Sequence, residues 1–375
     1  MMYIGARLPS IAPIIMTLRL VLSVPTLLLT ILLLSACERP DQAPVLTSPA
    51  WQWQYQDSTS FFIGIHAVDQ HIVWAAGSQG RVIRTTDGGA TWSTMFVPGA
   101  DSLQFRDVHA FDGKTAYVLS IGNGANSRIY KTTDGGTSWE LLFRNEDENA
   151  FYDCFSFWDA TSGFAFSDSY QEEFTLITTE DGGASWQRID PALVPDAREG
   201  EGAFAASGTC VQTGEGGLGW FATGASAVDT RVIRTTDYGA SWRESITPIA
   251  SQTGSEGIST MSVLDARHLV ILGGDFTQRD SIYANVAIST DGGATWTRGT
   301  SAPIGGSVYG STYVPGATTP TIIGVAPTGT AFSTDNASTW SRIDDTNFWT
   351  VTAVSPAAIW AAGPGGVARL IDSKN

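Results

Sequence analysis

The sequence has few positive charges, few cysteines and few charged residues of any kind. Lys and Arg number 21 against 37 Asp and Glu, so the 375-residue chain carries a formal net charge of −16. Such an acidic chain is unsuited to nucleic acid or to an anionic lipid surface, because both partners are negatively charged. The three cysteines and four histidines fall in no metal-ligand spacing. The sequence therefore predicts no metal site and no nucleic-acid partner.

A dinucleotide-binding fingerprint is also missing. The glycine-rich run at residues 214–217 precedes a predicted strand. A pyrophosphate site needs glycines that follow a strand and open a helix. We therefore expect no cofactor, and the sequence gives no support to a redox enzyme.

The longest apolar run, residues 20–34, is too short to span a membrane. It contains Pro25 and Thr26 and has about 15 residues, whereas a spanning helix needs roughly 20. With Arg19 before it and small residues after it, the run predicts a secretory signal over residues 1–36. Its removal takes away two arginines and leaves a net charge of −18.

The end of this signal, Leu-Ser-Ala-Cys, resembles that of bacterial lipoproteins. The resemblance implies that Cys37 is lipidated and that residues 37–50, which are polar and rich in proline, form a flexible tether. Because Glu38 rather than Asp follows the cysteine, we expect an anchor in the outer membrane, facing the periplasm.

Two further cysteines, Cys154 and Cys210, would then lie in an oxidising compartment. They could form a disulfide or remain buried free thiols, and connectivity cannot be deduced from sequence. The sequence leaves this choice open.

What the chain has in abundance is glycine (40) and tryptophan (13), arranged in a repeat. The pattern Ser/Thr-x-Asp-x-Gly-x-Thr/Ser-Trp occurs at five places, and a sixth copy at 333–340 has Ala337 in place of the glycine. Asp can bond the backbone that follows it and glycine permits positive φ, so each copy predicts a tight turn between two strands. The predicted structural residues are Asp87, Trp92, Asp134, Trp139, Asp181, Trp186, Asp237, Trp242, Asp291, Trp296, Asp335 and Trp340.

Alternating apolar segments precede these turns and recur at the spacing of four-stranded propeller blades. Seven such segments predict an all-β, seven-bladed propeller over residues 51–375. The seventh unit ends without its outer strand, and residues 51–56 have the composition to supply it and close the ring. The predicted innermost strands are 61–69, 105–112, 151–159, 204–212, 258–265, 307–314 and 348–355.

These turns resemble the Asp-box (BNR) repeats of sialidases, sortilin-type receptors, xyloglucanase-type hydrolases and photosystem II assembly factors. The spelling Arg-Thr-Thr-Asp-Gly-Gly-x-Thr-Trp at residues 84–92 is most similar to the assembly-factor type and its bacterial lipoprotein relatives. That resemblance implies a protein that binds partners. A single sequence does not report any link to photosynthesis.

Candidate functional residues gather at the predicted central channel, mainly in the first half of the ring. The most unusual stretch is 196–202, whose charges interrupt an apolar and glycine-rich register. Turn formation, strand hydrogen bonds and local charge neutralisation are the simpler interpretations. The candidates are Arg106, His109, Tyr152, Arg198 and His66 for binding, and Asp107, Asp153, Asp168, Glu199 and Glu201 for catalysis.

We favour an envelope-anchored, monomeric lipoprotein that acts as a protein-binding scaffold or assembly factor, with an envelope protein or a glycan as partner. The alternative is a glycoside hydrolase, sialidase-like or otherwise exo-acting, in which two of the candidate carboxylates would act as a pair. Recognition of a sialic acid carboxylate needs converging arginines, yet only Arg106 begins a predicted innermost strand. The sialidase Arg-Ile/Leu-Pro signature is absent after residue 36, and the chain has length for one propeller.

Overall fold

The computed structural model describes residues 46–225 and 229–372. The predicted signal peptide, Cys37 and most of the predicted tether lie outside these residues. Within the described part, no helix has the length and apolar character needed to cross a membrane. Its helices are three short 3₁₀ turns, η1 (Gly124–Asn126), η2 (Pro191–Leu193) and η3 (Glu215–Gly217).

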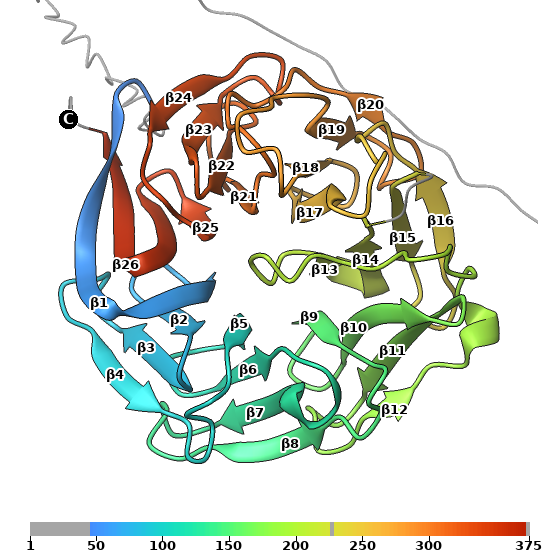
Figure 1. The fold of residues 1–375 in the computed structure, drawn as a ribbon. Coiled ribbons are helices and arrows are strands. Elements are labelled where there is room, and N and C mark those ends of the chain that lie inside the picture. Colours follow the sequence, from blue (N-terminus) through green and yellow to red (C-terminus); the bar gives the residue numbers. More distant parts are fainter. Residues whose placement is uncertain (1–45, 226–228, 373–375) are drawn as a thin grey trace, which may run out of the picture. The chain divides into compact units, whose positions relative to one another are not determined.

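All other regular structure is β, and the sheets surround a common centre (Figure 1). The all-β propeller predicted from the sequence is confirmed. One sheet contains β25 (Thr350–Ser355), β26 (Ala358–Asp372), β1 (Pro49–Ala67), β2 (Val73–Gly77), β3 (Arg81–Thr85) and β4 (Ser93–Phe96).

The other five sheets have four strands each, which follow one another in chain order from the centre outward (Figure 1). They are β5 (Phe105–Ala110), β6 (Ala116–Ser120), β7 (Arg128–Thr132) and β8 (Glu140–Arg144); β9 (Tyr152–Phe157), β10 (Gly163–Tyr170), β11 (Glu173–Thr179) and β12 (Gln187–Arg188); β13 (Val211–Gly214), β14 (Leu218–Ala222), β15 (Arg231–Thr235) and β16 (Arg243–Ile246); β17 (Glu256–Val263), β18 (Leu269–Asp275), β19 (Val286–Ser289) and β20 (Thr297–Arg298); β21 (Gly310–Tyr313), β22 (Ile322–Ala326), β23 (Gly329–Ser333) and β24 (Ser341–Asp344).

The prediction of seven blades is wrong, because the described residues form six sheets. The physical reason is the continuity of β1. Its first half pairs with β26, from Pro49 opposite Asp372 to Phe61 opposite Pro364, and its second half pairs with β2. The predicted first and seventh units are therefore joined in one six-stranded sheet, in which the blue β1 lies beside the red β26 (Figure 1).

The Asp turns join the third and fourth strands of their sheets, and each is held by the same local bonds. In the first, Thr85 Oγ1 donates to Asp87 Oδ1 at 2.8 Å, and Thr91 donates to Asp87 through both its backbone N–H and its hydroxyl. Gly88 and Gly89 have φ of 73° and 94°, a region that glycine adopts at little cost. The sequence therefore builds these turns from residues within one octet.

The tryptophan that ends each turn packs against the preceding sheet. Trp139 meets Trp74 of β2 with ring centroids 6.5 Å apart, and Trp242 meets Phe164 of β10 at 5.1 Å. Trp74 itself donates from Nε1 to the Asp112 carbonyl at 3.0 Å. Aromatic contacts of this kind contribute beyond the apolar area that they bury, so the repeated turns also fasten neighbouring sheets together.

These turns predict acid sensitivity. Hydrogen bonds from the following Ser or Thr lower the pKa of Asp87, Asp134, Asp181 and Asp291 from 3.8 to about 2. The folded state then binds fewer protons than the unfolded state between these values, so stability present above about pH 4 is lost as the pH falls toward 2. We expect the urea midpoint to fall over this window and the Asp291→Asn variant to show a shallower fall. Equal midpoints at pH 2 and pH 6 would contradict this.

Candidate functional site

The centre of the ring is crossed by residues 203–209, which we call the central segment. The sequence predicts an innermost strand over 204–212, but β13 begins only at Val211. The residues before it leave the sheet and extend into the middle of the ring, where Figure 1 shows them in yellow-green. The predicted strand is therefore corrected to a short strand preceded by a crossing segment.

The central segment is held by contacts with several sheets. Arg106 Nη1 of β5 donates to the Ala205 carbonyl at 2.6 Å, and Thr350 Oγ1 of β25 donates to the Ser207 carbonyl at 3.3 Å. Ser207 Oγ donates to the Tyr309 carbonyl at 2.7 Å. The Arg106 and Thr350 side chains thus satisfy backbone carbonyls of the segment that lack a neighbouring strand to bond.

A disulfide anchors the end of the central segment. Cys154 of β9 and Cys210 form the bond, with their Cα atoms 6.0 Å apart and both side chains buried. Cys210 directly follows the segment, so the bond ties it to β9. The structure thus decides the question that the sequence leaves open for this pair.

The central segment separates the middle of the ring into two sides. Arg106 lies near the beginning of β5 and His109 near its end. We call the side on which the innermost strands begin the upper face, and the side on which they end the lower face. Candidate residues occur on both.

On the upper face, Arg106 is half-buried beside aromatic and acidic groups. Its guanidinium carbon lies 5.7 Å from the centre of the Trp349 ring, and its Nη2 donates to Gln104 Oε1 at 3.1 Å. Burial lowers the pKa of Arg106, while the negative charge of Asp153 acts in the opposite direction. A guanidinium over an indole face is a favourable cation–π arrangement.

Five aromatic side chains continue from this point as an arc, which we call the aromatic arc. They come from five separate parts of the chain, and consecutive ring centroids lie 4.4, 4.9, 4.8 and 4.4 Å apart. Four of the five side chains remain partly exposed. In order, the arc contains Phe204, Phe276, Tyr309, Trp349 and Phe61.

Two candidate carboxyl groups lie next to each other near Arg106. Asp153 is 1% exposed, and its Oδ2 has no hydrogen-bond partner among the described residues. Burial and the neighbouring Asp168 raise the pKa of Asp153. Asp168 accepts from the Ala203 N–H at 2.8 Å, and burial raises its pKa also. These groups hold the start of the central segment and favour a shared proton.

The lower face contains a cavity of about 280 Å³ at the ring centre. The central segment contributes Ser207, Gly208 and Thr209 to its lining, and the innermost strands form its walls. His66 and His109 both line it, with ring centroids 4.8 Å apart. Asp107 lines it as well, and its Oδ2 accepts from the Phe155 N–H at 2.9 Å.

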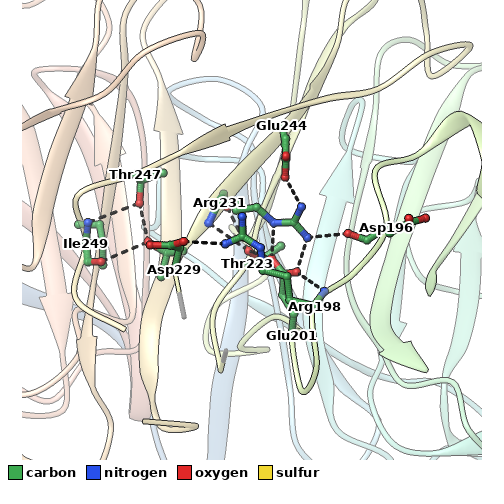
Figure 2. A network of polar contacts seen from close by, with 10 residues as sticks. Asp196, Arg198, Glu201, Thr223, Asp229, Arg231, Glu244, Thr247 and Ile249 are labelled. Carbon is green, nitrogen blue, oxygen red and sulfur yellow. Dashed lines mark hydrogen bonds and ion pairs between the residues drawn. The ribbon is translucent and has the colours of Figure 1, made fainter. Parts of the chain in front are cut away.

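The charged stretch at 196–202 forms an ion-pair network with β15 and β16 (Figure 2). The carboxylate of Glu201, whose side chain is 0% exposed, accepts from Arg231 and from Thr223 Oγ1, the latter at 2.6 Å. It also accepts from the Arg198 N–H at 2.9 Å. Arg231 pairs in addition with Glu244. The network fixes this loop to its sheet.

The predicted residues are thus divided among five environments. Arg106, Asp153 and Asp168 meet on the upper face, whereas Asp107, His66 and His109 meet in the lower cavity. Glu201 and Arg198 belong to the ion-pair network, where Arg198 Nη1 also reaches Asp229 at 3.1 Å. Tyr152 is buried against Phe143 at 5.2 Å, and Glu199 is exposed.

This distribution does not assemble the carboxylate pair that glycoside hydrolysis needs. Such enzymes place two carboxyl groups on either side of a bound sugar, about 5–10 Å apart. Asp107 is separated from Asp153 and Asp168 by the central segment, and Glu201 is saturated by its partners. Asp153 and Asp168 adjoin each other without an intervening space.

Sequence reasoning missed Arg231 and the aromatic arc. Arg231 belongs to an Arg-Val-Ile-Arg run identical to that at 81–84, so it is indistinguishable from a repeat residue. Phe61, Tyr309 and Trp349 carried a usable signal, because each stands within two residues of the start of a predicted innermost strand. Aromatics in that position predict an aromatic rim on one face.

The described residues contain no group of three or more His, Cys, Asp or Glu side chains placed to hold a metal ion.

A comparison with protein-family models matches residues 287–298 to the BNR/Asp-box repeat. One of the six repeats therefore matches the Asp-box model. The matched copy spans the turn between β19 and β20 and contains Asp291 and Trp296. A comparison with curated protein sequences gives no match.

Solved structures support the resemblance to Asp-box propellers. YCF48 bound to D1 peptide is 17% identical with a TM-score of 0.60, covering 90% of this chain and 99% of that one. YCF48 from Cyanidioschyzon merolae is 16% identical with a TM-score of 0.60, covering 87% and 100%. The GH74 xyloglucanase from Xanthomonas campestris is 14% identical with a TM-score of 0.55, covering 85% and 53%. At these identities the similarity shows the fold.

Proposed function

We propose that this Asp-box propeller is a scaffold that binds a partner protein on its upper face. The observation that carries the proposal is the aromatic arc, with the Arg106 guanidinium placed over its Trp349 ring. Binding hot spots are enriched in Trp, Tyr and Arg that lie together at the centre of an interface. One protein of similar fold, YCF48, has been solved with a D1 peptide, which is consistent with peptide recognition by this architecture.

The upper face suits a peptide or protein surface better than a small charged substrate. The arc offers partly exposed rings with few rotatable bonds, so little side-chain entropy is lost when a partner covers them. Arg106 supplies a single fixed donor group toward carbonyl or carboxylate oxygens. The neighbouring Asp153 and Asp168 compensate its charge, which favours a neutral or mildly polar partner segment over a strong anion.

We further propose that the propeller is held at the cell envelope as a monomeric lipoprotein through Cys37. This part rests on the sequence, because Cys37 lies outside the described residues. Fractionation of cells that express the full chain tests it. Recovery of the protein with outer-membrane vesicles is expected, and recovery in the soluble fraction would contradict the proposal.

The binding proposal predicts a loss on removal of the arc. In crosslinking of the envelope fraction followed by mass spectrometry, the wild-type chain should capture a reproducible partner protein. Trp349→Ala with Arg106→Ala should weaken the affinity for that partner by about 30-fold or more, the effect of losing a hot spot. Tyr238→Ala removes an exposed aromatic from an Asp box and should bind as the wild type does.

The proposal would be overturned if the Trp349→Ala/Arg106→Ala variant captured the partner protein as well as the wild type does. Turnover of aryl-glycosides or envelope polysaccharides by the purified chain would also overturn it in favour of an enzyme. Thermal unfolding of each variant separates a lost contact from a lost fold.

A further inference from the structure

The cavity on the lower face is lined by residues that the proposed partner site does not use. Its lining includes residues from the central segment and from the innermost strands β1, β5, β9, β13, β17, β21 and β25. At about 280 Å³ it is near the small end of the range for ligand pockets, about 300–1,000 Å³. The central segment lines one side of this cavity, which we call the recess.

Several hydrogen-bonding groups face this recess without an internal partner. The His109 imidazole and the Gln212 amide line the cavity, and neither side chain has a hydrogen-bond partner among the described residues. Asp107 uses Oδ2 for the Phe155 N–H and directs Oδ1 toward Gly208, where a Cβ would come within 2.4 Å. Amides and neutral imidazoles both donate and accept, so the recess offers both functions.

Burial shifts the titratable groups of the recess toward their neutral forms. Burial lowers the pKa of His66 to about 4, and burial together with His66 lowers the pKa of His109. Burial raises the pKa of Asp107. Among the described lining residues there is no lysine or arginine. An anionic ligand would therefore lose its hydration without gaining a counter-charge, and a cationic ligand would meet a carboxyl group whose ionised form burial disfavours, so both would be costly to bind.

The recess also has apolar walls between its polar groups. Ile65, Val263, Val351 and Pro315 line it beside serine and threonine hydroxyls. Alternation of C–H surface with hydrogen-bonding groups matches a molecule whose carbons each carry a hydroxyl. Charged metabolites, flat apolar molecules and metal ions do not match this lining.

We propose that the central cavity binds a small neutral polyhydroxylated molecule, either a monosaccharide or a polyol of similar size. His109, Gln212 and Asp107 orient its hydroxyls, and the aliphatic residues contact its C–H face. This inference does not rest on the proposed protein-binding function, because the two sites lie on opposite sides of the central segment.

The test is titration of the full-length chain in detergent, followed by saturation-transfer NMR and calorimetry. Neutral monosaccharides and polyols are compared with glucuronate and glucosamine, which have the same size and carry a charge. We expect a neutral ligand to bind with a Kd on the order of millimolar, as its size allows, and the charged analogues to bind at least tenfold more weakly. Titration with an oligosaccharide shows whether the recess binds only a free sugar or also the end residue of a glycan.

Two variants assign binding to the recess. His109→Phe keeps an aromatic ring among Phe111, Phe155 and Phe157 and Gln212→Leu keeps the volume, so both should fold, as thermal unfolding checks. Each should weaken binding at least tenfold. Gln187→Leu is the matched control on the exposed β12 and should bind normally. Absence of binding at 50-fold the expected Kd, equal binding of charged analogues, or retained binding in both variants would overturn the proposal.

Discussion

Replacement of Arg231 by methionine is expected to lower the free energy of unfolding by about 3–5 kcal/mol, the range for breaking a buried ion pair. The Arg231 side chain is 3% exposed and that of Glu201 is 0% exposed. Removal of the guanidinium would leave the Glu201 carboxylate buried with no counter-charge. The remaining bonds from Thr223 and the Arg198 N–H do not neutralise it, and rehydration would require the loop at 196–202 to open.

Urea denaturation followed by tryptophan fluorescence measures this effect. Arg188→Met is the matched control, because Arg188 and Glu173 form an ion pair whose side chains are 48% and 51% exposed, and exposed pairs contribute about 0–1 kcal/mol. The double variant Arg231→Met/Glu201→Gln should recover part of the loss, since it removes the buried charge as well. A loss below about 1 kcal/mol for Arg231→Met would mean that the network is solvated.

Removal of the disulfide is expected to cost about 4 kcal/mol. Cys154 and Cys210 are 56 residues apart in sequence, and closing a loop of that length restricts the unfolded chain by about this amount. Cys154→Ala/Cys210→Ala leaves two small side chains at buried positions, so the loss of packing adds little. The free energy of unfolding in urea, under non-reducing conditions, measures the difference from the wild type.

The wild type in excess reductant supplies the comparison for this variant. Once unfolded, it should refold to the stability of the double alanine variant, because both lack the covalent constraint. The variant should also differ from the wild type under native conditions, before global unfolding. Amides of the central segment should exchange hydrogen faster in the variant, since Cys210 directly follows that segment. Equal stability of the oxidised wild type and the variant would show that the unfolded chain is constrained by other means.

Local features of this protein could be predicted from the sequence. The Asp turns depend on bonds between residues two to four apart, such as those between Asp87 and its neighbours Thr85 and Thr91, so adjacent residues contain all the necessary information. The pairing of residues 51–56 with the last strand was also readable, because the seventh unit lacked an outer strand and β1 supplies it.

The candidate site was predictable only in part. The sequence shows which residues could contribute to a site, but it does not show which of them lie together in the folded chain. Arg106, Asp153 and Asp168 were named as candidates and do meet on the upper face. Asp107 directly follows Arg106 in the chain, yet it contributes to a cavity on the other side of the central segment. Nothing within the local sequence states on which side of that segment a residue falls.

The number of sheets, the path of the central segment and the role of Arg231 were decided by the tertiary structure. Residues 81–84 and 231–234 have the same sequence, but Arg81 pairs with Asp57 and Arg231 pairs with Glu201. The sequence by itself determined the turns, the all-β class and the segment that pairs with the last strand. These features follow from hydrogen bonds between near neighbours and from the periodicity of short stretches. Contacts between residues 24 to 143 positions apart form only when separate strands and segments pack together, and therefore only the folded chain determines them.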